Sequence, residues 1–159
     1  MTTLPADARC ALSDLVHRYA ANIDDREFDF AASLFMPDGA LTLPDPPADL
    51  GPVRCHRGQV AIAAALAAVA AVARTEHAIV GEVYDAAARP GRATGRIACV
   101  AHHWDQRGNE VVDVVWHLRY DDEYKLTDAG WRISLRTLTI NAIETRPVRR
   151  LRPRDPDRV

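Results

Sequence analysis

Two histidines and one aspartate are the residues of this chain whose types best suit proton transfer. His77 and His102 lie 25 residues apart on segments whose composition alternates like strands, and Asp24 ends a stretch of helical periodicity that also carries Tyr19. A carboxylate beside an imidazole fixes its tautomer and stabilises the imidazolium, so the pair can exchange a proton near neutral pH. The pattern predicts Asp24, His77, His102 and Tyr19 as a catalytic set for a small organic substrate.

Each of these residues also has a purely structural explanation. Asp24 can cap a helix, although Asp25 beside it could do so equally well, and a tyrosine on an amphipathic helix is common in cores. A histidine between apolar residues of a strand must either find a partner or line a cavity. A metal held by Asp24, His77 and His102 is geometrically possible, but no ligand spacing supports it, so we expect no metal and no cofactor.

The third long predicted strand offers further candidates for binding a substrate. Trp116 and Tyr120 share one face of that strand and His117 lies on the other, because side chains alternate along a strand. The sequence does not decide which face meets the cavity, so His117 and Tyr120 compete as pocket residues. With Trp104, on the face of His102, the predicted substrate-binding residues are Trp104, Trp116, His117 and Tyr120.

Length and composition indicate one globular domain. The chain has 159 residues, 48% hydrophobic and 26% charged, and a formal net charge of −2, which gives no bias toward nucleic acid or an anionic membrane. The most apolar stretch, residues 60–73, is too short to cross a bilayer. The three cysteines have no motif spacing, and no basic start precedes an apolar run, so we expect a cytoplasmic protein without nucleic-acid or membrane partners.

Helical signals dominate the first half of the chain. Apolar residues at three- and four-residue spacing predict helices over residues 5–24 and 26–34, and an alanine-rich stretch predicts a third over residues 59–73. A short strand is expected over residues 40–43. Residues 44–52 contain four prolines and one glycine, which predicts a loop that could cover a pocket.

Strands dominate the second half. Alternating runs over residues 75–88, 92–106, 111–126 and 131–145, joined by tight turns, predict an antiparallel meander. Helices followed by strands predict an α+β fold with the N-terminal helices packed on one sheet face. We expect the domain to span residues 1–146, and residues 147–159, rich in arginine and proline, to form a solvated tail rather than a contact with nucleic acid or an acidic partner.

Several short motifs in this order resemble the SnoaL-like group of the nuclear transport factor 2-like superfamily, over about residues 8–146. The resemblance rests on Arg18-Tyr19-Ala20 with Ile23-Asp24, Leu34-Phe35 with Pro37-Asp38, Thr75-Glu76-His77, Ala101-His102, and Gly130-Trp131-Arg132-Ile133. It implies a cone-shaped, barrel-like α+β fold in which helices close a curved antiparallel sheet around a deep pocket. It also implies a homodimer that pairs through the open sheet face.

Two kinds of dehydratase in that superfamily are similar to this chain in different ways. Scytalone dehydratase is similar at Asp24, His77 and His102, but its two pocket tyrosines fall at Ile23 and Leu43 here. Bile-acid dehydratases are similar in the spacing of Tyr19 and Asp24 and in a histidine matching His77, whereas their further acid is replaced by His102.

The resemblance therefore implies a cofactor-independent dehydratase acting on a hydroxylated cyclic ketone of polyketide-like or steroid-like type. One of His77 and His102 would take the proton, Asp24 would orient His102, and Tyr19 would polarise the carbonyl. Two alternatives stay open. One is a cyclase, an isomerase or an epoxide-opening enzyme using the same pocket. The other is a non-catalytic binding or assembly subunit.

Overall fold

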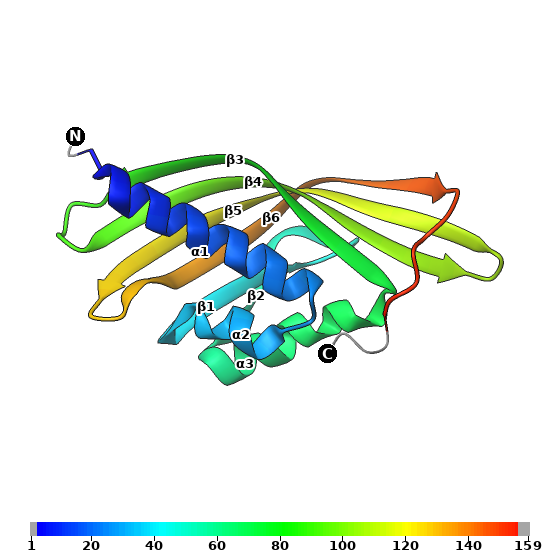
Figure 1. Cartoon of the computed structure of the whole chain (residues 1–159), viewed down its shortest axis with the longest axis horizontal. Helices are drawn as coiled ribbons and strands as arrows, with labels where there is room; N and C mark the ends of the chain where they lie inside the picture. The colour runs from blue at the N-terminus through cyan, green and yellow to red at the C-terminus, as the bar shows by residue number, and fades with distance from the viewer. Residues whose placement is uncertain (1–2, 156–159) are drawn as a thin grey trace.

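A computed structural model describes residues 3–155, so the last four residues of the predicted tail lie outside the described residues. One curved sheet forms a layer, and the helices lie across its concave side (Figure 1). The strand order is β2-β1-β6-β5-β4-β3, with β1 and β6 parallel and every other neighbouring pair antiparallel. The strands are β1 Phe35–Asp45, β2 Asp49–Arg57, β3 Arg74–Ala86, β4 Arg92–Arg107, β5 Glu110–Thr127 and β6 Gly130–Val148. The α+β prediction is confirmed, as a sheet that is mixed and open.

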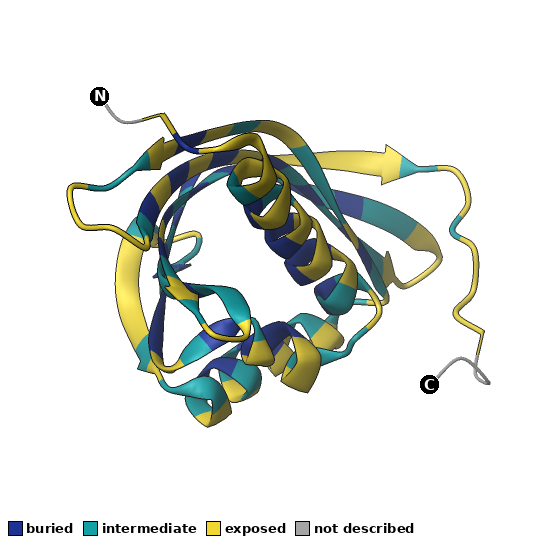
Figure 2. Ribbon diagram, turned by 60° about the vertical axis from the view of Figure 1, so that its left-hand side comes forward, coloured by how far each residue is buried: buried dark blue, intermediate teal, exposed yellow. Residues whose placement is uncertain are grey.

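The first helix, α1 (Ala6–Asp24), matches the predicted range and buries one side against the sheet. Its buried residues are spaced three and four apart, and they face the sheet in Figure 2. Burying a large apolar side chain of this kind contributes about 1.5–3 kcal/mol, so the stripe suffices to hold the helix in place. The helix therefore carries its last residue, Asp24, to the start of β3.

The other helices differ from the prediction at their ends. The second, α2 (Phe28–Ser33), begins two residues later than expected, because Arg26 has a φ of 66° and cannot continue a right-handed helix. The alanine-rich helix divides into α3 (Gln59–Leu66) and a 3₁₀ helix, η1 (Ala67–Ala71). Within residues 3–155 no helix is long and apolar enough to cross a membrane.

The predicted proline-rich loop is instead the tip of a hairpin formed by β1 and β2. Pro44 lies at a register irregularity of β1, and Pro52 lies in β2. Because β2 is the outermost strand of the sheet, part of its backbone needs no ladder partner, and proline is tolerated there. The predicted loop over residues 44–52 is confirmed only at residues 46–48, which form the turn, and it was wrong for the residues on either side, because proline content alone does not separate a loop from an edge strand.

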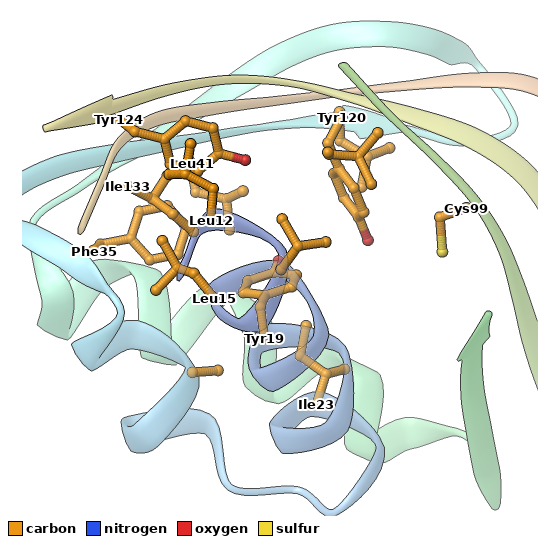
Figure 3. Packing of buried hydrophobic residues seen from close by; sticks show 14 of the residues in the cluster. Leu12, Leu15, Tyr19, Ile23, Phe35, Leu41, Cys99, Tyr120, Tyr124 and Ile133 are labelled. Atoms are coloured by element: carbon orange, nitrogen blue, oxygen red, sulfur yellow. The ribbon is translucent and has the colours of Figure 1, made fainter. Parts of the chain in front are cut away.

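The last strand also exceeds its prediction, since β6 pairs with β5 as far as Val148 rather than ending at residue 145. The core lies between α1 and the concave face of the sheet (Figure 3). It includes Phe35, Leu41 and Ile133, each fully buried. Toward the β3–β4 side this packing gives way to a cavity.

Candidate active site

A cavity of about 360 Å³ opens between the end of α1, the α3–η1 segment and the concave face of β3, β4 and β5. Apolar side chains such as Ile23, Leu66 and Val69 form most of its wall. Its polar lining residues are His77, His103, Tyr19, Tyr120, Asp105 and Arg107. The cavity is therefore a largely apolar site with a few polar groups, the usual character of a small-molecule site.

The carboxylate of Asp24 binds His77 twice. Its Oδ1 lies 2.7 Å from Nδ1 of the imidazole, and its Oδ2 accepts the backbone N–H of the same residue at 2.8 Å. Both side chains are largely buried, with exposed fractions of 22% for Asp24 and 7% for His77. Burial raises the pKa of Asp24, but the bonds and charge of His77 and a bond from Thr75 outweigh it and hold that pKa below its ordinary value. Asp24 is therefore an ionised carboxylate that fixes the proton of His77 on Nδ1 and leaves Nε2 for the cavity.

His103 is a second imidazole on the cavity wall. Its ring centroid lies 6.2 Å from that of His77, at an angle of 78°, and Trp116 packs on it at 4.5 Å. Nδ1 lies 2.9 Å from the carbonyl oxygen of Val114, and because a carbonyl only accepts, this nitrogen carries the proton. Burial lowers the pKa of His103, which favours the neutral ring. His103 therefore offers an unprotonated Nε2 beside His77.

The inner end of the cavity has two phenols backed by a buried cation. The guanidinium of Arg136 lies between the rings of Tyr19 and Tyr120, 4.2 and 4.3 Å from their centroids. Arg136 is held by two bonds to Asp122, at 2.8 and 2.6 Å, and both side chains are fully buried. Burial raises the pKa of Tyr19 to about 12, against the charge of Arg136, so this phenol stays protonated. Tyr19 can therefore donate a hydrogen bond to a substrate oxygen.

The structure places His102 elsewhere, which corrects the expectation that it shares a hollow with His77. His77 pairs with Ala101 across β3 and β4, so it is Ala101 and His103 that share its face of the sheet. His102 lies on the opposite face, where its Nδ1 is 2.6 Å from Asp113 and its ring stacks on Trp104 at 5.2 Å. Neither His102 nor Trp104 lines the cavity, and the carboxylate that contacts His102 is Asp113 instead of Asp24.

The competing candidates of β5 are also separated by the sheet faces. Trp116 and Tyr120 line the cavity, as does Leu118 between them. His117 lies on the other face, 3.5 Å from Glu144. The structure thus brings together Asp24, His77, Tyr19, Trp116 and Tyr120, and it excludes Trp104, His102 and His117.

Three residues in or behind the site were not predicted as site residues from the sequence. His103 was set aside because one of two adjacent histidines had to point away, and the composition of β4 did not show which. Arg136 and Asp122 gave a weak signal, because opposite charges in the middle of two apolar strands suggest a buried pair, and they are partners in the β5–β6 register. No three His, Cys, Asp or Glu side chains among residues 3–155 gather in a way that could hold a metal ion.

Comparison with known proteins identifies the family and the fold of the chain. The model of the SnoaL-like domain matches residues 5–137. No curated protein matches the sequence. Among solved structures, the Kfla4162 protein of Kribbella flavida is 27% identical, with a TM-score of 0.71 over 87% of this chain and 93% of that one.

Two further solved structures share the fold at lower identity. A candidate scytalone dehydratase from Novosphingobium aromaticivorans is 18% identical, with a TM-score of 0.71 over 96% of this chain and 97% of its own. The hexachlorocyclohexane dehydrochlorinase LinA-type3 of Novosphingobium barchaimii is 16% identical, with a TM-score of 0.70 over 94% and 96%. At these identities the likeness shows the fold alone.

Proposed function

This chain belongs to the SnoaL-like domain family, and from its cavity we propose that it is a cofactor-independent lyase that removes water from a hydroxylated cyclic ketone. The observation that carries the proposal is the buried Asp24–His77 pair. Asp24 occupies Nδ1 of His77 and leaves its Nε2 for the apolar cavity, which His103 also lines. The similarity in fold to a candidate scytalone dehydratase supports the same class of reaction.

The proton donors and acceptors of the site suit an elimination reaction. Nε2 of His77 takes a proton from the carbon next to the carbonyl, and Asp24 stabilises the imidazolium that forms. The electron pair of that C–H bond becomes the new C=C bond as the C–O bond of the hydroxyl group breaks. The departing hydroxide takes the proton back from His77 and leaves as water, so the enzyme returns to its starting state.

The other polar groups orient the substrate in this scheme. His103, neutral and unprotonated at Nε2, accepts a hydrogen bond from the substrate hydroxyl group, which fixes the leaving group near His77. Tyr19 donates to the carbonyl oxygen, where negative charge develops as the proton is removed. A volume of about 360 Å³ lies at the lower end of small-molecule sites and favours a substrate of one to three rings.

The experiment is a panel of β-hydroxy cyclic ketones, scored by mass for the loss of water, with variants of the three histidines. We expect His77→Gln to lower kcat by about a hundred- to ten-thousandfold, the usual contribution of a general base. His103→Gln should weaken turnover as well. His102→Gln is the matched control, because the same residue type one position away lies outside the cavity, and it should leave turnover unchanged.

Two results would contradict the proposal. Full activity in His77→Gln would show that His77 is not the base. A product with the same mass as the substrate would indicate isomerisation or cyclisation in place of dehydration.

Elimination of a halide is a second candidate, favoured by the protonation of His103. The only ring proton of neutral His103 is on the nitrogen that donates to the Val114 carbonyl, so His103 has no proton to give to a leaving group. A halide departs without needing a proton, whereas a departing hydroxide must take its proton from His77. The similarity in fold to a dehydrochlorinase points the same way. Chloride release from chlorinated cyclohexanes, lost in His77→Gln and kept in His102→Gln, would support this candidate.

A further inference from the structure

The turn after α1 places an arginine where glycine is the usual residue. The backbone N–H of Glu27 bonds to Asn22 at 2.8 Å and that of Arg26 to Ile23 at 3.1 Å, the two bonds of a Schellman motif. In this motif Arg26 has the left-handed conformation, with a φ of 66°, and no other non-glycine residue among residues 3–155 has a positive φ. A strained backbone of this kind persists only where the surrounding structure holds it, and such positions cluster at functional sites.

The side chain of Arg26 links the end of α1 to the start of β3. One guanidinium nitrogen donates to the Thr75 hydroxyl at 3.0 Å, and another donates to the Val72 carbonyl at 2.9 Å. Thr75 is only 4% exposed and lies two residues before His77. The arginine thus joins the element that carries Asp24 to the element that carries His77.

The contact with Arg26 also sets the direction of the Thr75 hydroxyl. Because Thr75 accepts from the guanidinium, its own O–H remains available to donate, and Thr75 helps to lower the pKa of the Asp24 carboxyl. The carboxylate of Asp24 itself is bonded to the backbone N–H and the ring of His77, two residues after Thr75. This donor chain therefore consists of the hydrogen bond from Arg26 to Thr75 and the influence of Thr75 on Asp24, and it acts beside the two bonds with which His77 holds the carboxylate.

We propose that Arg26 is a positioning residue of the active site, which acts through Thr75 to hold Asp24 in place against His77. This inference rests on the proposed function, because its consequence for turnover requires His77 to be the base. Its structural consequence, a carboxylate fixed by a donor chain, does not require any substrate to be known.

The decisive variant is Arg26→Gly. Glycine adopts a positive φ without strain, so the variant removes the side chain while relieving the backbone. We expect kcat to fall about ten- to hundredfold with KM unchanged, because the base loses its alignment. The melting temperature should stay the same or rise, whereas a merely structural arginine would lower it. Arg26→Lys, which can donate to one partner but cannot form the two-pronged contact, should recover part of the activity.

Titration of the Asp24 carboxyl carbon by NMR tests the donor chain without a substrate. The pKa of Asp24 should rise toward its ordinary value in Arg26→Gly and in Thr75→Val, and it should return in Thr75→Ser, which keeps the hydroxyl. Arg154→Ala is the matched control, because that arginine bonds to the backbone carbonyl of Asp24 at 3.2 Å and leaves the carboxylate alone.

The outcomes separate the two proposals. An unchanged Asp24 titration in both Arg26→Gly and Thr75→Val overturns the role of Arg26, whatever the activity. A shifted titration supports the role, even if no panel substrate is turned over by the wild type. In that case it is the proposed dehydration that fails.

Discussion

Replacing Arg136 by methionine should destabilise the protein more than almost any other single change in the cavity region. The guanidinium is fully buried, makes two bonds to Asp122 at 2.8 and 2.6 Å, and lies between the rings of Tyr19 and Tyr120. Burial would lower the pKa of Arg136, but the charge of Asp122 raises it well above its usual value. Methionine fills a similar space without charge, so Asp122 would keep only the bond from Tyr124 at 2.5 Å.

The magnitude follows from leaving one charge of a buried pair without its partner. Removing one member of such a pair costs about 3–5 kcal/mol, because the remaining carboxylate is neither solvated nor neutralised. Loss of the two cation–π contacts acts in the same direction. For a chain of this size each kcal/mol corresponds to about 2–4 °C, so the melting temperature should fall by about 6–20 °C.

Urea denaturation followed by circular dichroism at neutral pH measures this free energy directly. The double variant Arg136→Met with Asp122→Leu supplies the control, since removing both charges avoids the unpaired carboxylate and should recover most of the loss. A loss below about 1 kcal/mol in the single variant would refute the reasoning, because that is the range of exposed ion pairs. A double variant as unstable as the single one would show that packing, and not the charge, is responsible.

Three further predictions concern pH, packing and thiol accessibility. Burial lowers the pKa of His103, so the unfolded chain binds more protons than the folded chain below about pH 6.5. The free energy of unfolding should therefore fall as the pH falls. The urea midpoints at about pH 7.5 and about pH 5 should differ less in His103→Gln than in the wild type. Gly95→Ala would place a methyl group 2.8 Å from the ring of Tyr124 and should cost about 1–3 kcal/mol in the same assay, whereas Gly51→Ala, with nothing within 4 Å, should be neutral. Cys99 is buried and its pKa is raised to about 12, so a thiol reagent should label two of the three cysteines rapidly in the native protein and the third only after unfolding.

Much of the local structure could be predicted from the sequence, because it depends on periodicity within one element. The apolar stripe of residues 5–24 predicted α1 and placed Asp24 at its end. The alternating runs predicted β3 to β6, and the resemblance to SnoaL-like proteins added the cone shape that the structure confirms. The proline-rich segment was misinterpreted, since only its position at the edge of the sheet makes a strand there possible.

The tertiary structure decided which residues of each strand face the cavity. A shift of one residue in the pairing of two strands moves every side chain to the other face, and composition does not determine that pairing. The register of His77 with Ala101 selects His103 over the adjacent His102, and the same alternation selects Tyr120 over His117.

The sequence by itself thus determined the types of residue available for proton transfer and the elements that carry them. The sequence contains Asp24 and His77, but their positions along the chain do not give the distance between their side chains in space. The fold brought them to 2.7 Å, because α1 lies alongside β3 and ends beside the start of that strand (Figure 1). That contact joins a helix and a strand whose residues are 53 positions apart in the chain, and it depends on packing that no local pattern encodes.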